Sequence, residues 1–191
     1  AEEKLTLSGI AITSSLIEET FGQRLPLPHL MHMNLALGVE KKEGKDHRLF
    51  AGIGVDELFD LQTEIVCALD GFEDIVGQLA ASPLHDFSIS FKDNSLLARI
   101  AYTFAPNASK DFLLSQLQQA KDPEEKAVAE KLTLFVEQPG TLTIASTPGT
   151  TVSFPELTEM SEDKVIRLFT LSVTPGKESF DTQIARIQAE N

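Results

Sequence analysis

Apolar and polar residues alternate along several stretches of this chain, and no other feature restricts the possible folds as strongly. Between residues 84 and 91, Phe87, Ile89 and Phe91 occupy every second position, and polar residues lie between them. Successive side chains of a strand point to opposite faces, so this pattern predicts an antiparallel strand with one buried face. The same reasoning predicts further strands over residues 4–13 (with a bulge near Gly9), 30–40, 48–55, 58–69, 141–147, 150–154 and 170–174.

The middle of the chain follows the helical period instead. The clearest start signal is Asp122-Pro123-Glu124-Glu125, which combines an N-cap, a proline at the first helical position and two acids in the first turn. Apolar residues three and four positions apart mark the inner faces of the other segments. Helices are predicted over residues 70–81, 94–105, 109–120, 123–137, 155–160 and 162–169, and the tail from residue 177 has the same period.

Strands and helices are therefore segregated along the chain rather than alternating. This order is typical of the α+β class, and we expect a mainly antiparallel twisted sheet with helices packed on one face. The strands over 30–40, 48–55 and 58–69 should form a meander, and the helices over 94–105, 109–120 and 123–137 would cover one face of the sheet. No low-complexity linker divides the chain, so we expect a single domain over residues 1–176 and a C-terminal tail over 177–191.

The charge balance narrows the classes of partner. The chain has 29 acidic and 16 basic residues, which gives a net charge of −13. Such a chain repels phosphate backbones and anionic lipid surfaces, so we expect no nucleic-acid partner. No apolar stretch reaches the roughly 18 residues that a transmembrane helix needs, so no integral membrane segment is expected. A basic protein partner remains compatible with the charge.

The first residues and the single cysteine bear on the compartment. Cys67 is the only cysteine, so an internal disulfide is excluded, but this leaves the compartment open. The chain begins Ala-Glu-Glu-Lys, which suits a mature start after signal-peptide cleavage; removal of Met or a shortened chain explains it as well. We expect a periplasmic protein, with the cytoplasm as the alternative.

Two histidines suggest a metal site only weakly. His29 and His32 flank Met31, and Met33 follows, so imidazole and thioether ligands lie close in sequence. The segment reads as extended, which points the two rings to opposite faces, and alternating methionines in a strand usually fill the core. We therefore expect no metal ligand here.

The remaining motifs are explained by ordinary structural roles and do not require a catalytic or cofactor site. Gly52 and Gly54 supply only a fragment of a dinucleotide-binding fingerprint, and Cys67 with His85 lacks an electropositive setting for a thiolate. Two groups of carboxylates lie near turns and predicted helix starts, where acids are common and solvated: Asp56, Glu57 and Asp60, and Asp70, Glu73 and Asp74. We predict no catalytic residue and no cofactor, and Cys67 should be a small buried hydrophobe.

What remains is an apolar sheet face covered by apolar helices. Such an arrangement either closes a dry core or lines a groove for an acyl chain, and periodicity cannot separate the two. The candidate groove residues are Phe87, Ile89, Phe91, Leu97, Phe104 and Phe112.

Two stretches carry a resemblance to a known group. One is LHDFSISFKDNSL over residues 84–96; the other is FVEQPGTLTI over 135–144, continued by LFTLSV over 168–173. Their order resembles a group of uncharacterised proteobacterial exported proteins, over about residues 84–174 of this chain. The group is distantly similar to the β-rich AsmA-type and YdgA-type envelope proteins, some of which are linked to lipid movement. The resemblance implies an envelope location and carries over no catalytic residues.

These observations together favour a non-enzymatic bacterial envelope protein that binds a protein partner or a lipid-like apolar ligand in a groove between sheet and helices. The alternative is an intracellular, acidic module for protein–protein interaction. A hydrolase whose catalytic residues are scattered through the fold stays open.

Overall fold

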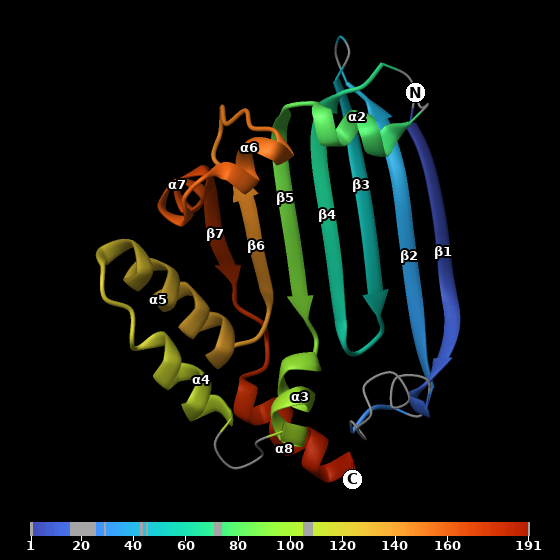
Figure 1. Cartoon of the computed structure of the whole chain (residues 1–191). Coiled ribbons are helices and arrows are strands. Elements are labelled where there is room, and N and C mark those ends of the chain that lie inside the picture. The colour runs from blue at the N-terminus through green and yellow to red at the C-terminus, as the bar shows by residue number, and fades with distance from the viewer. Residues whose placement is uncertain are drawn as a thin grey trace.

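Seven strands form one antiparallel sheet in which every strand pairs with its neighbour in the sequence (Figure 1). The computed structural model describes residues 2–15, 26–28, 30–42, 44, 46–70, 74–104 and 109–190. The α+β class and the predicted meander are confirmed. The strands are β1 (Glu2–Thr13), β2 (Leu30–Lys41), β3 (Asp46–Val55), β4 (Phe59–Ala68), β5 (Leu84–Asp93), β6 (Thr141–Ser146) and β7 (Phe169–Thr174).

The predicted bulge in β1 is present. The register against β2 shifts between Leu7 and Ile10. Gly9 has φ +69°, a conformation that glycine adopts readily, and its N–H donates to Asn34 Oδ1 at 3.1 Å. The extra residue keeps apolar side chains on the same face on both sides of the bulge.

The register sorts the side chains into one apolar and one polar face. Leu5 pairs with Leu37, which pairs with Ala51, and the same row continues through Thr63 and Ile89. Paired residues point to the same side of a sheet, so the apolar positions of all seven strands share one face. The positions between them carry mostly charged, hydroxyl and small residues.

Seven helices are formed by the described residues, and they lie around the rim of the sheet (Figure 1). The start signal at Asp122 is confirmed, because its side chain accepts a hydrogen bond from the Glu125 N–H at 2.8 Å and Pro123 opens the helix. The helices are α2 (Ile75–Ala81), α3 (Leu96–Phe104), α4 (Ser109–Leu117), α5 (Pro123–Glu137), α6 (Phe154–Glu159), α7 (Glu162–Leu168) and α8 (Phe180–Glu190).

The helices that touch the sheet do so on its apolar face, as expected. Phe135 of α5 meets Phe91 edge to face, with ring centroids 6.2 Å apart. Leu79 of α2 packs on a core cluster at one end of the strands, and Leu96 of α3 packs on another at the opposite end. The third core cluster joins α3 to α8, in which Phe180 and Ile187 are buried.

The structure differs from the prediction in three places. Residues 150–154 form no strand: Val152 makes an isolated bridge to Leu84, and α6 starts at residue 154 because Ser153 and Glu156 form a capping box. The helix predicted over 70–81 starts at residue 75, after an Asp74 N-cap with φ +51°. Helix α4 packs on α5 rather than on the sheet.

Candidate functional site

Among the described residues, no helix lies over one part of the apolar sheet face. We call this part the open sheet surface and define it as Leu5, Leu7, Leu35, Leu37, Ala51 and Ile53, which lie in the middle of β1, β2 and β3 and share one face. Three of the leucines are largely exposed: Leu5 at 58%, Leu7 at 48% and Leu37 at 56%. Contiguous exposed apolar groups are uncommon on the surface of a lone protein, so these leucines are the first candidate for a binding surface.

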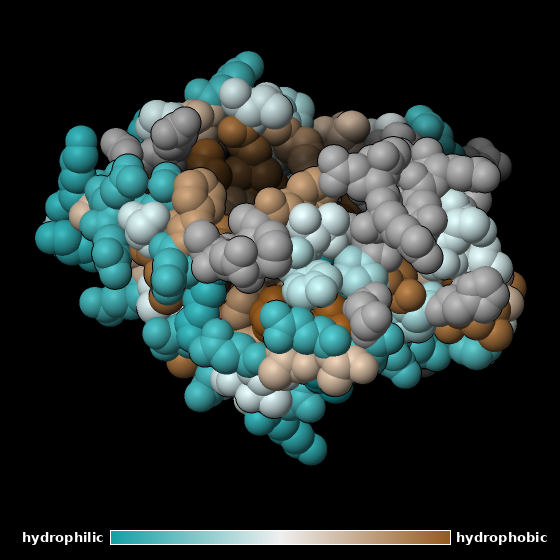
Figure 2. Space-filling view, turned by 90° about the horizontal axis from the view of Figure 1, so that it is seen from below, coloured by the Kyte–Doolittle hydropathy of each residue, from teal (hydrophilic) through white to brown (hydrophobic). Residues whose placement is uncertain are grey.

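Helices border the apolar face, of which this surface is one part, on three sides. Helices α2 and α6 lie at one end of the strands, α3 lies at the other, and α5 lies beyond the surface toward β7 (Figure 1). The remaining side is the β1 edge. Seen from the end of the sheet that holds α3 and α8, the molecule has a hollow with hydrophobic residues at its base, which lies toward the α4 and α5 side and not over β1 (Figure 2).

The opposite face of the sheet is polar and internally paired. Arg48 donates to Glu64 Oε2 at 2.5 Å and to Glu40 Oε2 at 3.3 Å, and so bridges three neighbouring strands. The Lys4 ammonium lies 5.8 Å from the centroid of the Phe50 ring. This contrast shows that the exposed leucines belong to one face and are not a general property of the sheet.

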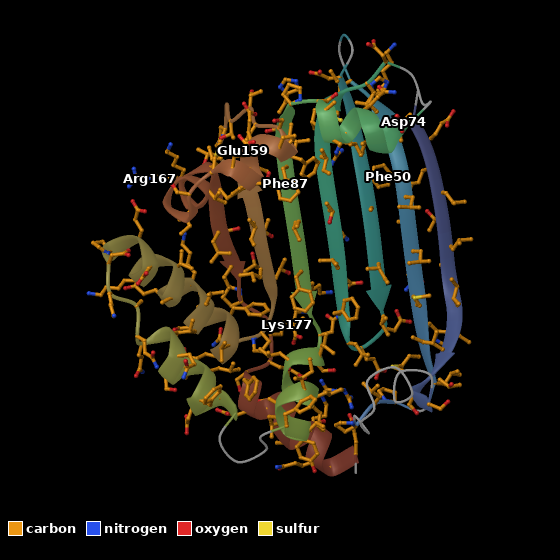
Figure 3. All side chains as sticks on the ribbon, in the orientation of Figure 1. Phe50, Asp74, Phe87, Glu159, Arg167 and Lys177 are labelled. Carbon is orange, nitrogen blue, oxygen red and sulfur yellow. The ribbon has the colours of Figure 1, made fainter. Side chains whose placement is uncertain are left out.

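The candidate residues on β5 lie on the apolar face, near the helices. Phe87 contacts Phe169 with ring centroids 5.9 Å apart and lies next to α6 (Figure 3), where a small apolar cavity of about 70 Å³ separates the two elements. Phe91 touches both Phe59 and Phe135, and Ile89 lies between Phe87 and Phe91 on the same face. These three side chains therefore line the helix-covered part of the face, beside the open sheet surface.

The three helical candidates lie apart from this group. Leu97 packs against the α3–α8 cluster. Phe104 and Phe112 are each 60% exposed, at the end of α3 and in α4. The leucines of the open sheet surface were not among the candidates, although their alternation was visible, because the alternation does not say which part of the face a helix covers.

The other motifs occupy structural positions. Cys67 is buried, as predicted, and burial raises the pKa of its thiol, which disfavours a reactive thiolate. Met31 is buried against Val55 and Leu58, as expected for core filling. His29 lies outside the described residues, and His32 Nδ1 is 3.8 Å from Asp56 Oδ2. Across the described part of the chain, no three His, Cys, Asp or Glu side chains are placed to hold a metal ion.

A second concave site lies where the end of β5, the start of β6 and the end of β7 meet α8. We call it the junction cleft; it has a volume of about 820 Å³. Acidic, basic and amide side chains line it, including Glu57, Asp93, Lys177, Gln183 and Arg186. Lys177 lies near the ends of β6 and β7 (Figure 3). Sequence reasoning did not bring these residues together, because they come from chain segments far apart.

Asp93 is the buried acid of the junction cleft and is 3% exposed. Its Oδ1 atom accepts a hydrogen bond from the Leu97 N–H at 2.8 Å and so caps α3. Burial raises the pKa of Asp93 to about 6, and the backbone N–H groups of Leu97 and Leu96 only partly oppose this rise. The Asp93 carboxyl therefore titrates close to neutral pH.

Comparison with known proteins adds a family but no activity. Residues 50–175 match a family model that is described as "Uncharacterized protein". The chain belongs to this family. The matched region begins in β3 and ends just after β7, so it contains most of the sheet and α2 to α7. No curated protein and no solved structure matches the chain significantly. None of the helices formed by the described residues is long and apolar enough to span a membrane.

Proposed function

We propose that this protein is a non-enzymatic binding protein of the bacterial envelope, which takes the apolar chain of a lipid-like ligand onto its open sheet surface. The observation that carries this proposal is the exposure of Leu5, Leu7 and Leu37 on the apolar face, on the edge strand β1 and its neighbour β2. The resemblance of residues 84–174 to exported proteins supports the envelope as the location.

The shape of the surface suits an extended apolar chain. The open sheet surface takes in three residues of each strand, over residues 5–7, 35–37 and 51–53, which corresponds to roughly 7 Å along the strands at about 3.3 Å per residue. The three strands that carry the surface are about 10 Å across, at roughly 4.8 Å between neighbours. A patch of this size accommodates a segment of a single acyl chain lying against the strands.

The energetics are favourable for such a ligand. Burying a leucine completely is worth about 1.5–3 kcal/mol, and roughly half of each of the three exposed leucines remains to be buried. Covering them therefore contributes about 2–5 kcal/mol, before the buried surface of the ligand itself is counted. The net charge of −13 disfavours an anionic bilayer as the occupant, so a single lipid-like molecule fits better than a membrane surface.

Titration with an uncharged apolar dye tests the proposal. N-phenyl-1-naphthylamine fluoresces in apolar surroundings, and we expect saturable binding that a monoacylglycerol displaces. Replacing Leu37 with Ser should weaken binding of the dye. The matched control is Ala36→Ser, the neighbouring position of β2, whose side chain lies on the polar face.

Two results would contradict the proposal. One is the absence of saturable dye binding. The other is binding that Leu37→Ser and Ala36→Ser leave equally strong, which would place the apolar site elsewhere. Native mass spectrometry of protein purified from its own host provides an independent check, since we expect a bound mass that is lost on denaturation.

A further inference from the structure

The junction cleft is built from rigid backbone. Its lining includes two Pro-Gly pairs, Pro139-Gly140 and Pro175-Gly176, which connect α5 to β6 and β7 to α8. They pass so close together that a Cβ atom at either glycine would overlap the backbone of the other pair. The Asp93 N–H also donates to Gly140 O at 2.7 Å. The cleft is therefore a preformed feature, and its volume of about 820 Å³ is within the range of small-molecule sites.

Unsatisfied polar atoms gather in the wall of this cleft. Asp93 and Gln183 are each 3% exposed, and Asp93 Oδ2 and Gln183 Oε1 have no hydrogen-bond partner among the described residues. The Nε–H of Arg186 also lacks a partner within this part of the chain. A buried polar group without a partner costs about 1–3 kcal/mol, so one donor and two acceptors in a single cleft call for an explanation.

Two exposed charges of opposite sign lie in the same cleft. Glu57 and Lys177 both line it, and neither forms an ion pair with another described residue. Apart from the buried Asp93, the other charged groups of the lining are paired, as in Arg186 with Glu178 at 3.4 Å and Lys92 with Asp60 at 3.7 Å. The unpaired charges are therefore one carboxylate and one ammonium at the surface, with the half-satisfied Asp93 behind them.

Glu57 is also held in a strained conformation. Its φ is +65°, which costs a residue with a side chain roughly 1 kcal/mol. The strain is maintained by contacts, because the Ser95 hydroxyl donates to Glu57 O at 2.5 Å and Leu58 O accepts from the Ser95 N–H at 3.2 Å. Asn or Gly would adopt this conformation more easily, so the glutamate is unfavourable for stability at this position.

We propose that the junction cleft binds a small zwitterion, a molecule that carries an ammonium group and an oxyanion a few bonds apart. The ammonium interacts with Glu57 and Asp93 and donates to Gln183 Oε1, and the oxyanion interacts with Lys177 and the Arg186 Nε–H. A simple anion leaves the two buried acceptors unsatisfied, and a simple cation leaves the donors unsatisfied. The site does not involve the open sheet surface, so it stands independently of the proposed function.

A nuclear magnetic resonance titration of the whole chain tests this site directly. The probe is O-phosphoethanolamine, and the reporters are the side-chain signals of the Gln183 amide and the Arg186 Nε–H. We expect saturable shifts of both signals, with a Kd of about 1 mM or below, corresponding to roughly 4 kcal/mol or more. No saturable shift would overturn the proposal.

Two matched ligands test the zwitterion. Inorganic phosphate lacks the ammonium, and phosphocholine has a quaternary nitrogen without N–H donors. We expect each to bind at least tenfold more weakly than O-phosphoethanolamine, and equal binding of either one would overturn the assignment. A short-chain phosphatidylethanolamine then separates the two sources of the chemistry. If it binds more tightly than the free zwitterion, the source is a lipid headgroup; if it binds more weakly, the source is a free metabolite.

Variants of the two unpaired charges complete the test. We expect Lys177→Met and Glu57→Gln each to weaken binding of O-phosphoethanolamine by about tenfold. Glu57→Gly should raise the midpoint of thermal unfolding by relieving the strained φ, and should weaken binding at least as much as Glu57→Gln does. A Glu57→Gly protein that binds as well as the parent would show that the residue is structural only. Leu37→Ser is the control, because a change on the open sheet surface should leave this binding intact.

Discussion

Replacing Asp93 with Asn should stabilise the protein at neutral pH, and this gain should be lost in acid. The folded-state pKa of Asp93 is about 6, against an ordinary value of 3.8. Below pH 3.8 the carboxyl is neutral in both the folded and the unfolded state, so burial costs nothing there. Above pH 6 it is ionised in both states, and the buried charge destabilises the fold.

The size of this effect follows from the shift. One pKa unit corresponds to about 1.4 kcal/mol, so a rise from 3.8 to about 6 corresponds to roughly 3 kcal/mol. The Asn variant escapes this cost at every pH, and its Oδ1 atom can still cap α3 by accepting from Leu97. Its new N–H₂ group needs partners of its own, which lowers the expected gain to about 1–3 kcal/mol.

Urea unfolding, followed by circular dichroism, measures the difference. With an m-value of about 2 kcal/mol per molar urea, the midpoint of the Asp93→Asn variant should rise by roughly 0.5–1.5 M at pH 7.5. The gain should diminish as the pH falls from 6 toward 4. The difference between variant and parent matters here, because the other carboxyls titrate in both proteins.

The same substitution at Asp122 serves as the control. Asp122 is an exposed cap of α5, and its charge interacts favourably with the helix N-terminus. Asp122→Asn should therefore lower stability slightly at pH 7.5, in the opposite direction. Equal effects of the two substitutions, or a gain at residue 93 that does not vary with pH, would refute the burial argument.

Three further predictions concern packing and binding. Leu37→Ser should raise the Kd for the apolar dye about five- to tenfold, because roughly 1–1.4 kcal/mol of leucine burial is lost, and a fluorescence titration against Ala36→Ser measures it. Gly140→Ala should lower the free energy of unfolding by about 2–3 kcal/mol, since the added Cβ overlaps backbone, whereas Gly52→Ala meets only ordinary contacts and should change little in urea unfolding. Arg99 is 1% exposed and donates a hydrogen bond to Glu190 Oε2 at 2.9 Å. Arg99→Met should lower the free energy of unfolding by about 2–3 kcal/mol, and a loss below about 0.5 kcal/mol in urea unfolding would contradict its role as a link between α3 and α8.

Most of the fold could be predicted from the sequence, because alternation and helix caps are local signals. Asp122 and Pro123 marked the start of α5 correctly, and alternation placed Phe87 and Phe91 on the apolar face. Residues 150–154 also alternate, but Val152 pairs only with Leu84, so the local signal lacked a neighbouring strand to extend it.

The two candidate sites could not be predicted from these local signals. Periodicity identifies which residues share a face, but coverage depends on where the helices pack, so Leu37 could not be recognised as exposed. The junction cleft depends on the meeting of Glu57, Asp93 and Gln183, which come from three distant segments. The sequence has three Pro-Gly pairs, at 139–140, 148–149 and 175–176, and only the first and last line the cleft, so the repeat alone could not point to it.

The order of strands in the sheet has a consequence for how the molecule assembles and opens. Each strand adds to the one made just before it, so the ladder can grow outward from the β2–β3–β4 hairpins without any segment being threaded between others. β1 is held by one neighbour, and its described residues from 3 to 9 are all exposed. Its amide hydrogens should exchange with solvent first and those of β4 last, so protection would fall from the centre of the sheet toward the edge that carries Leu5 and Leu7.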